Sequence, residues 1–286
     1  MGYDNITTSC FNMKYTIESA QPLAFHSDYD TESGILIYPR GDNIVTVTHS
    51  GNKDRAVLKV DKRYSKEVAE MFRLSDNMDK VYAYIETDAF MKNAVQRYSG
   101  MRLTLNNPWE TTLCFIISQF NNVKKIRLTT KNIINKFGPK VYADGIVVGK
   151  GFPSSEMLSK QTVKDFQGCG AGFRAKYIKE AAEYCTNNLD LGSLNGKTYE
   201  EIKENLMVIP GVGSKVADCI ALMGYGKLEA FPIDVWVKRT MEKVYFNGRK
   251  KKEDAIRDLA FEKWGRMAGY AQQYLFWNGR QNDRVK

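Results

Sequence analysis

Residues 209–219 of this chain read IPGVGSKVADC, and residues 232–235 read PIDV. Two glycines that flank one apolar residue predict a tight turn with a helix starting directly after it, and the free backbone amides there favour a bound anion such as phosphate. Lys215 falls in the first turn of that helix, where a cation is disfavoured. Asp234 follows 19 positions later. An anion site, an amine and a carboxylate together indicate chemistry on a nucleic acid.

The composition bounds the class of protein. With 286 residues, 43% of them hydrophobic, the chain is long enough to bury a substantial core, and its net charge of +9 fits a partner rich in phosphate. The five cysteines are scattered without a Cys-x-x-Cys pair, so we expect neither a zinc site nor an iron–sulfur cluster. The sequence shows no signal peptide and no apolar run of membrane length, which predicts an intracellular protein, cytoplasmic and associated with the nucleoid.

The hydrophobic pattern changes along the chain and predicts an α+β fold. Three β-branched runs, with a turn expected at 39–42, are typical of an antiparallel sheet and lie at residues 34–38, 43–48 and 56–60. Residues 65–99 have helical spacing, and helices are expected to dominate from Asn107 onward. We therefore predict an N-terminal antiparallel sheet domain with a helix at 1–100 and a mainly helical domain at 101–286, with a helix-hairpin-helix at about 202–224.

Residues 209–234 closely resemble the helix-hairpin-helix Gly/Pro…Asp superfamily of DNA glycosylases, and within it the lysine-bearing 8-oxoguanine DNA glycosylase/AP lyase branch. The resemblance extends in the expected order over about 100–280. Its further segments are residues 102–103, 107–110, 115–122, 172–177 and 269–276. The resemblance implies a DNA N-glycosylase with β-lyase activity that flips a modified purine such as 8-oxoguanine out of DNA and excises it.

The resemblance gives Lys215 and Asp234 catalytic roles. Lys215 would attack the sugar C1′ and form a Schiff base, and Asp234 would stabilise the positive charge that develops on the sugar. Each residue also has a simpler interpretation, a lysine that contacts a phosphate and an aspartate that caps a helix. We favour the catalytic interpretation because the two occur together at this spacing, and Asp234 can perform both tasks.

A flipped base needs a pocket, since chemistry on a base in a duplex requires that the base leave the stack. Gln272 and Phe276 are four residues apart and therefore share one helix face. The resemblance implies that Gln272 bonds the Watson–Crick edge of the base, that Phe276 stacks on it, and that Cys219 packs on its other side. From spacing alone, Phe276 would be a core aromatic, Gln272 a surface amide and Cys219 a small buried hydrophobe.

The resemblance also implies contacts with the duplex. The hairpin would hold the phosphate backbone, a second loop would fill the gap left by the base, and other side chains would contact the partner base. The residues concerned are Gly211, Val212, Gly213, Asn121, Asn122, Lys125, Phe173 and Arg174. We expect a monomer whose partner is double-stranded DNA containing a modified base, with no membrane involved. No cofactor or catalytic metal is expected, and a monovalent or calcium ion at the hairpin carbonyls would be structural.

The N-terminal third departs from the family where the base is recognised. Relatives carry a glycine whose carbonyl accepts the N7 hydrogen that distinguishes 8-oxoguanine from guanine. Here residues 19–25 read SAQPLAF, so Ala20 replaces the glycine at this wall of the base pocket and a proline follows Gln21, which restricts the backbone. We therefore expect weakened selectivity for 8-oxoguanine.

Three further positions also differ from the family pattern. Phe120 stands where an asparagine that contacts the opposite strand is usual, and Trp236 replaces a histidine found in some members. Lys125 stands where an arginine that contacts the partner base is common, and lysine lacks the donor fork of arginine. We expect looser discrimination of the base opposite the target.

Two alternatives to 8-oxoguanine repair stay open. A pocket with altered walls could accept another modified base, including a hypermodified base of phage DNA in a defence role. From a different class, the alternative is a non-catalytic helix-hairpin-helix DNA-binding protein. The presence of both Lys215 and Asp234 speaks against that second alternative.

Overall fold

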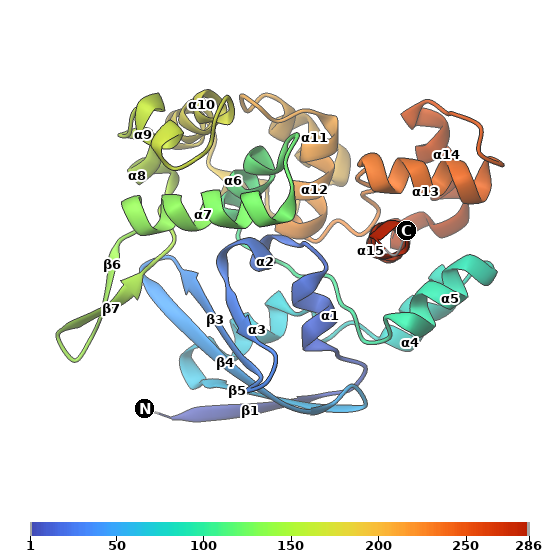
Figure 1. Ribbon diagram of the computed structural model, residues 1–286, viewed down its shortest axis with the longest axis horizontal. Coiled ribbons are helices and arrows are strands. Elements are labelled where there is room, and N and C mark those ends of the chain that lie inside the picture. Colours follow the sequence, from blue (N-terminus) through green and yellow to red (C-terminus); the bar gives the residue numbers. More distant parts are fainter. Residues whose placement is uncertain (1, 285–286) are drawn as a thin grey trace.

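The computed structural model describes residues 2–284 and arranges them as an antiparallel sheet beneath a larger body of helices (Figure 1). The sheet has five strands in the order β1-β5-β4-β3-β2, and every neighbouring pair is antiparallel. The strands are β1 Tyr3–Thr8, β2 Asp28–Asp30, β3 Ile35–Arg40, β4 Asn43–Asn52 and β5 Arg55–Asp61. The predicted α+β class, an N-terminal antiparallel sheet followed by helices, is confirmed.

The sheet packs one face on a small core of its own. Along β5, buried and more exposed side chains alternate, as expected for an antiparallel sheet with one solvated face. Leu36, Val47 and Leu58 from three neighbouring strands meet Phe11 and Phe72 in this core. The short helices that accompany the sheet are α1 Met13–Glu18, α2 Pro22–His26 and α3 Ser65–Met71.

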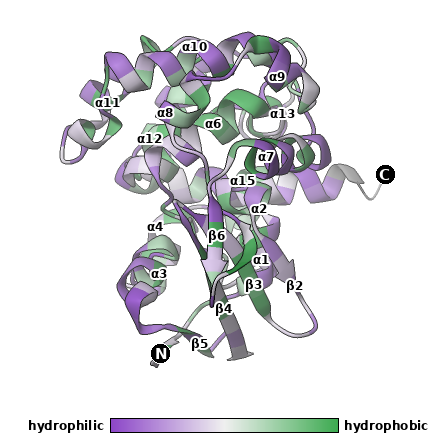
Figure 2. Ribbon diagram, turned by 90° about the vertical axis from the view of Figure 1, so that its left-hand side faces the viewer, coloured by the Kyte–Doolittle hydropathy of each residue, from purple (hydrophilic) through white to green (hydrophobic). Residues whose placement is uncertain are grey.

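Helix α6, Pro108–Ser118, lies at the centre of the helical body, and its ribbon is largely green in Figure 2. All its residues from Trp109 to Ile117 are buried. The Asn107 side chain accepts hydrogen bonds from the first free backbone amides, and Pro108 occupies a position where its missing N–H has no cost. The helix packs against α12, Ser214–Tyr225, and α7, Val123–Phe137.

The remaining helices complete the body around α6. They are α8 Ser155–Ser159, α9 Val163–Gly168, α10 Arg174–Asn187, α11 Tyr199–Met207, α13 Val235–Tyr245, α14 Glu253–Trp264 and α15 Ala268–Arg284. Within residues 2–284, no helix combines the length and the apolar character needed to cross a membrane.

Helices α4, Met78–Ile85, and α5, Ala89–Arg97, precede α6 in the chain but pack against α15 (Figure 1). Their buried side chains, among them Ile85 and Met91, belong to the large core of the helical body rather than to the core under the sheet. Residues of the predicted N-terminal segment therefore belong to both cores, and the domain boundary at residue 100 stays a prediction.

Some elements differ from the sequence prediction. A two-stranded hairpin, β6 Lys140–Ala143 and β7 Ile146–Lys150, projects from the region where helices were expected (Figure 1). Its turn contains Asp144-Gly145, a hairpin signal that the pattern analysis missed. The turn predicted at residues 39–42 is also shorter than expected, because Arg40 at the end of β3 already pairs with Asn43 at the start of β4.

Buried hydrogen bonds join the sheet to the helical body. Gln21, which is fully buried, donates from its amide nitrogen to the Arg102 carbonyl over 2.9 Å and accepts at its amide oxygen from the Thr104 N–H over 2.7 Å. The Arg102 guanidinium, also buried, donates to backbone carbonyls at Ser9, Cys10, Arg73 and Asp76. The segment that contains Ala20 is therefore fixed against the strand-like stretch that leads into α6.

Candidate active site

The turn at the start of α12 depends on Gly211. This residue has φ +82°, a left-handed conformation that glycine adopts without strain, and a Cβ here would lie 2.7 Å from the Cβ of Tyr177 on α10. The Val212 N–H donates to the Ile209 carbonyl over 3.0 Å, which closes the turn. Gly213 then caps α12, so that Lys215 is the second residue of the helix, as predicted.

Gln119 ties this turn to the loop that follows α6. Its side-chain amide donates to the Gly211 carbonyl over 2.9 Å and to the Ile116 carbonyl over 3.2 Å. The hairpin and the predicted DNA-inserting loop are therefore held in one arrangement. The Ile209 and Gly211 carbonyls already accept hydrogen bonds, and an ion at the hairpin stays a prediction.

Asp234 begins α13 and lines the same cavity as Lys215. It is the N-cap, with its side chain accepting from the Val237 N–H over 2.7 Å, so the predicted capping role is confirmed. Burial raises the pKa of the Asp234 carboxyl, and the Val237 N–H and the Lys215 ammonium only partly oppose the shift. The Lys215 ammonium is therefore near enough to act on the Asp234 carboxyl by charge.

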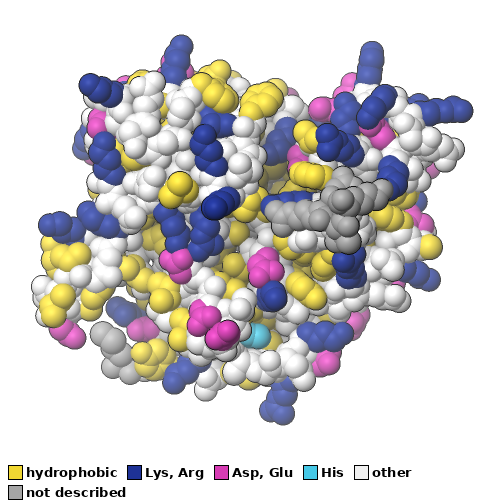
Figure 3. Space-filling view, in the orientation of Figure 1, with side chains coloured by type: hydrophobic (Ala, Val, Ile, Leu, Met, Phe, Trp, Pro, Cys, Tyr) yellow, Lys and Arg dark blue, Asp and Glu magenta, His cyan; other side chains and the backbone are white. Residues whose placement is uncertain are grey.

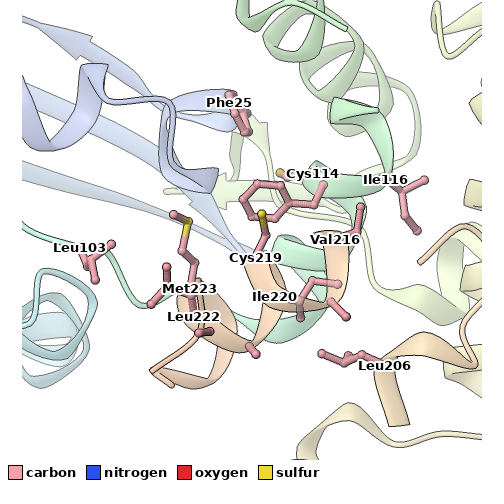
Figure 4. Packing of buried hydrophobic residues seen from close by; sticks show 14 of the residues in the cluster. Phe25, Leu103, Cys114, Ile116, Leu206, Val216, Cys219, Ile220, Leu222 and Met223 are labelled. Atoms are coloured by element: carbon pink, nitrogen blue, oxygen red, sulfur yellow. The ribbon is translucent and has the colours of Figure 1, made fainter. Parts of the chain in front are cut away.

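Cys219 lies one turn after Lys215 on the same helix and is buried. Burial raises the pKa of its thiol to about 11, although Lys215 lowers it by charge and by a hydrogen bond. The negative charge of Asp234 also raises the pKa of this thiol. Figure 4 shows that Cys219 and Met223 lie on the side of α12 that faces α2 and Phe25.

A cavity of ≈ 390 Å³ collects most of the predicted catalytic and pocket residues. Its walls come from α2, α6, α7, α12, α13 and α15, so residues far apart in the sequence meet there. The predicted residues that line it are Lys215, Asp234, Cys219, Gln272, Phe276, Ala20, Asn121 and Asn122. The Lys215 ammonium lies 5.2 Å from the centre of the Phe115 ring, another wall of the cavity.

Helix α15 supplies one face of the cavity. The Gln272 amide oxygen is buried and has no hydrogen-bond partner among the described residues, which leaves an acceptor for a bound molecule. Arg280, which the sequence analysis missed, also lines the cavity and holds its guanidinium 6.0 Å from the centre of the Phe276 ring. The four-residue spacing of Gln272, Phe276 and Arg280 was a signal that could have identified it.

Ala20 differs from the expectation in its backbone. It has φ +60°, the left-handed conformation that the family glycine would adopt with less strain. Gln273 donates to the preceding Ser19 carbonyl over 2.8 Å, and Gln21 is held by Arg102 and Thr104, so both flanks are fixed. Pro22 starts α2, where proline fits the first turn. Buried contacts therefore hold alanine in this conformation, and the weakened selectivity expected from the loss of the glycine stays a prediction.

Arg174, for which contact with the partner base stays a prediction, shapes the loop after α6. It is buried, and its guanidinium donates to the Gln119 carbonyl over 2.6 Å and to the Phe120 carbonyl over 2.8 Å. These bonds use the planar donor fork of arginine to shape the loop after α6. In this structure the residue supports the loop rather than projecting toward a partner base.

The loop after α6 presents aromatic side chains to solvent. Phe120 is 94% exposed in a left-handed conformation with φ +48°, and the exposed Phe173 ring lies 6.4 Å from it, centre to centre. Asn122 caps α7 by accepting from the Lys125 N–H over 3.0 Å, and the Asn121 amide donates to the Ile117 carbonyl. Large exposed aromatics on a fixed turn are unusual unless they meet a partner.

Basic side chains surround these features. Lys125 is exposed on the first turn of α7. On the face shown in Figure 3, lysine and arginine side chains are spread over the helical half, with fewer acidic side chains between them. This distribution suits the phosphate backbone of a nucleic acid.

Comparison with known proteins agrees with the fold. The family description "HhH-GPD superfamily base excision DNA repair protein" matches residues 113–266, and "8-oxoguanine DNA glycosylase, N-terminal domain" matches residues 5–112. An N-glycosylase/DNA lyase of Saccharomyces cerevisiae is 33% identical over 282 residues, covering 86% of this chain and 71% of that protein. A probable N-glycosylase/DNA lyase of Methanothermobacter thermautotrophicus is 29% identical, covering 79% of this chain and 78% of that protein.

A solved structure extends the similarity to the whole chain. Clostridium acetobutylicum 8-oxoguanine glycosylase/lyase, in complex with DNA containing cytosine opposite 8-oxoG, has a TM-score of 0.86 and 31% identity, covering 99% of this chain and 100% of that one. Fold and site thus define a helix-hairpin-helix DNA glycosylase/AP lyase. The chain belongs to the HhH-GPD superfamily of base excision DNA repair proteins. The non-catalytic alternative is thereby set aside.

The hairpin geometry gives a first prediction. Gly211→Ala should destabilise the protein by about 1–3 kcal/mol, because alanine is strained at positive φ and its Cβ meets Tyr177. Gly213→Ala is the matched control, since nothing lies within 4 Å of its Cβ and its φ is −91°. Urea unfolding of both variants checks this. Equal stability of the two would contradict the role given to Gly211.

Proposed function

We propose that the protein removes 8-oxoguanine from double-stranded DNA and cleaves the abasic product through a Schiff base on Lys215. The observation that carries the proposal is the cavity in which Lys215 and Asp234 face Gln272, Phe276 and Cys219. Groups for chemistry at a sugar and groups for holding a base line the same space. All of them come from one chain, which supports action as a monomer.

The first step is displacement of the base. The neutral Lys215 amine attacks C1′, the bond between C1′ and the base nitrogen breaks, and the base leaves with its electron pair. The departing base takes up the proton that the newly bonded Lys215 nitrogen gives up. Positive charge develops on the sugar, and the Asp234 carboxylate stabilises this charge. The interaction is stronger than in water because the site is buried and of low polarity. Cys219 remains a protonated thiol, because its pKa is raised to about 11, and it does not compete as a nucleophile.

The second step is strand cleavage. The sugar ring opens as the Lys215 nitrogen forms an imine with C1′. Loss of a proton from C2′ then expels the 3′ phosphate, and water hydrolyses the imine to release the lysine. A covalent amine explains how one site can carry out both steps without a metal or redox cofactor.

The base-holding wall supports an oxidised purine as the substrate. The unpartnered Gln272 oxygen can accept from the N–H groups on the Watson–Crick edge of the base, and Phe276 offers an aromatic face. Ala20 lines the cavity with a positive φ that glycine also adopts, which makes its carbonyl a candidate acceptor for the N7 hydrogen of 8-oxoguanine. We therefore propose more selectivity for 8-oxoguanine than the sequence alone suggested.

The opposite strand is proposed to be read loosely. Phe120 and Phe173 can occupy the stack beside the extruded base, and stacking on an aromatic ring is tolerant of base identity. Arg174 is engaged with the carbonyls of Gln119 and Phe120. Lys125 provides a point charge without a fork. These features favour positioning over base-specific hydrogen bonds.

The covalent step predicts that borohydride will trap the wild-type protein on DNA containing 8-oxoguanine. Lys215→Gln should abolish trapping while DNA binding changes little, because only the nucleophile is lost. Lys66→Gln, which removes an exposed lysine of α3 outside the cavity, is the control and should still be trapped. Undiminished trapping of Lys215→Gln would refute the assignment.

The electrostatic role of Asp234 predicts a loss in rate rather than in folding. Asn caps helices about as well as Asp, so Asp234→Asn should keep the stability of the protein while slowing single-turnover base release by roughly 10²–10³-fold. Measured DNA affinity should change far less. If affinity and rate fell in parallel, Asp234 would be a cap without a catalytic role.

Specificity is tested with a panel of DNAs. 8-oxoguanine should be released fastest, and replacing the opposite base should change the single-turnover rate by less than about tenfold, or ~1.4 kcal/mol. Ala20→Gly should retain the preference for 8-oxoguanine, because it keeps the carbonyl and relieves strain. Faster release of another base, including a hypermodified one, would replace 8-oxoguanine as the substrate, and a strict preference for cytosine opposite would contradict the loose reading of the partner strand.

A further inference from the structure

A second cavity, of ≈ 340 Å³, lies at the junction of the sheet and the helical body. We call it the junction cavity and define it by His26, Tyr38, Arg40, Glu67, Glu70 and Glu110, all of which line it. It adjoins the N-terminal end of α6 and Gly224 near the C-terminal end of α12. The first cavity, lined by Lys215 and Gln272 and here called the base cavity, adjoins the opposite ends of these two helices, at Ser118 and Lys215. The proposed glycosylase reaction uses none of these side chains.

Two polar side chains of the junction cavity are buried without partners. His26 is 3% exposed and Tyr38 is 2% exposed, and neither imidazole nitrogen nor the phenol oxygen has a hydrogen-bond partner among the described residues. Burial, with the charges of Arg40 and nearby basic groups, lowers the pKa of His26 to about 3, so its ring is neutral and keeps an acceptor nitrogen. Buried polar atoms without partners are rare and call for a bound molecule.

The junction cavity has more acceptors than donors. Arg40 donates to Glu67 over 2.6 Å and to the buried Glu110 over 3.4 Å, and Glu70 adds a third carboxylate. Two carboxylates, Glu67 and Glu110, share the Arg40 guanidinium, which is therefore already engaged, and the Glu70 carboxylate lies 3.8 Å from the Lys66 ammonium. A molecule that fits this chemistry brings N–H donors and positive charge.

We propose that the junction cavity binds a small organic cation with an ammonium or amidinium group, whose N–H donors reach Glu110 and the free acceptors of His26 and Tyr38. A bare metal ion fits less well, because the described residues contain no group of three or more His, Cys, Asp or Glu side chains arranged to hold one. The proposal does not depend on the glycosylase reaction.

A ligand in the junction cavity would also bear on the base cavity through α2. This helix has five residues, and Leu23 and His26 line the junction cavity while Phe25 lines the base cavity, with Ala20 just before it. Interactions that fix His26 therefore restrict the wall against which a flipped base would lie. The site is placed to modulate base release.

The test is calorimetric titration of the whole protein, without DNA, using putrescine as the probe and 1,4-butanediol as the uncharged control of the same length. We expect saturable binding of putrescine and none of butanediol. Glu110→Gln should weaken binding at least tenfold. Tyr38→Phe, which removes only a buried hydroxyl, should weaken it several-fold with folding retained. Glu156→Gln, on the exposed α8, is the matched control and should bind as the wild type does.

Three outcomes would overturn the proposal. The first is that putrescine shows no saturable binding to the wild type. The second is that Glu110→Gln and Tyr38→Phe bind putrescine as tightly as the wild type does, and the third is that the cavity binds Mg²⁺ in place of putrescine. Because DNA is absent, none of these outcomes bears on Lys215 chemistry. A second measurement compares single-turnover base release with and without putrescine at fixed ionic strength. We expect a rate change of at least twofold in the wild type that is absent in Glu110→Gln, and an equal change in both would show that the amine acts on the DNA.

Discussion

The close contact between Gly211 and Tyr177 is the constraint on which the active site depends. Only a residue without a Cβ allows the turn to approach α10, and the same turn offers its carbonyl to Gln119. This contact fixes where α12 begins, and therefore where Lys215 stands relative to the loop after α6. One turn thereby relates Lys215, the start of α12 and the exposed aromatic side chains of Phe120 and Phe173.

A second set of constraints, made of buried polar groups, shapes the wall of the base cavity. Gln21 bonds the backbone of the stretch that leads into α6, and Gln273 bonds the Ser19 carbonyl from α15. Ala20 is held between them at positive φ, a strained conformation that persists because its surroundings determine it. Hydrogen bonds from two distant segments thus hold alanine in a backbone conformation that glycine would adopt without strain. The strained residue lies at the wall where a base would be recognised.

The charged groups at the two ends of the α6 and α12 pair differ. At one end Lys215 and Asp234 share the base cavity, where burial favours the neutral carboxyl of Asp234. At the other end Glu110 is buried beside Arg40, and burial raises its pKa to about 7. Side chains on α2 line both cavities. The same pair of helices therefore supports a reactive site and, at a distance, a second polar cavity.

The sequence by itself determined the α+β order of elements and the hairpin before α12, because these depend on local spacing and turn chemistry, which a linear pattern carries. The roles proposed for Lys215, Asp234, Gln272 and Phe276 came from the resemblance of the sequence to a family, since spacing alone left simpler interpretations open. Only the tertiary structure decided that Ala20 keeps a left-handed backbone, that Arg174 supports a loop, and that α4 and α5 join the helical core. Each of these results from contacts between segments far apart in the chain, and such contacts override local preference because they involve buried hydrogen bonds and packing that no short stretch of sequence contains.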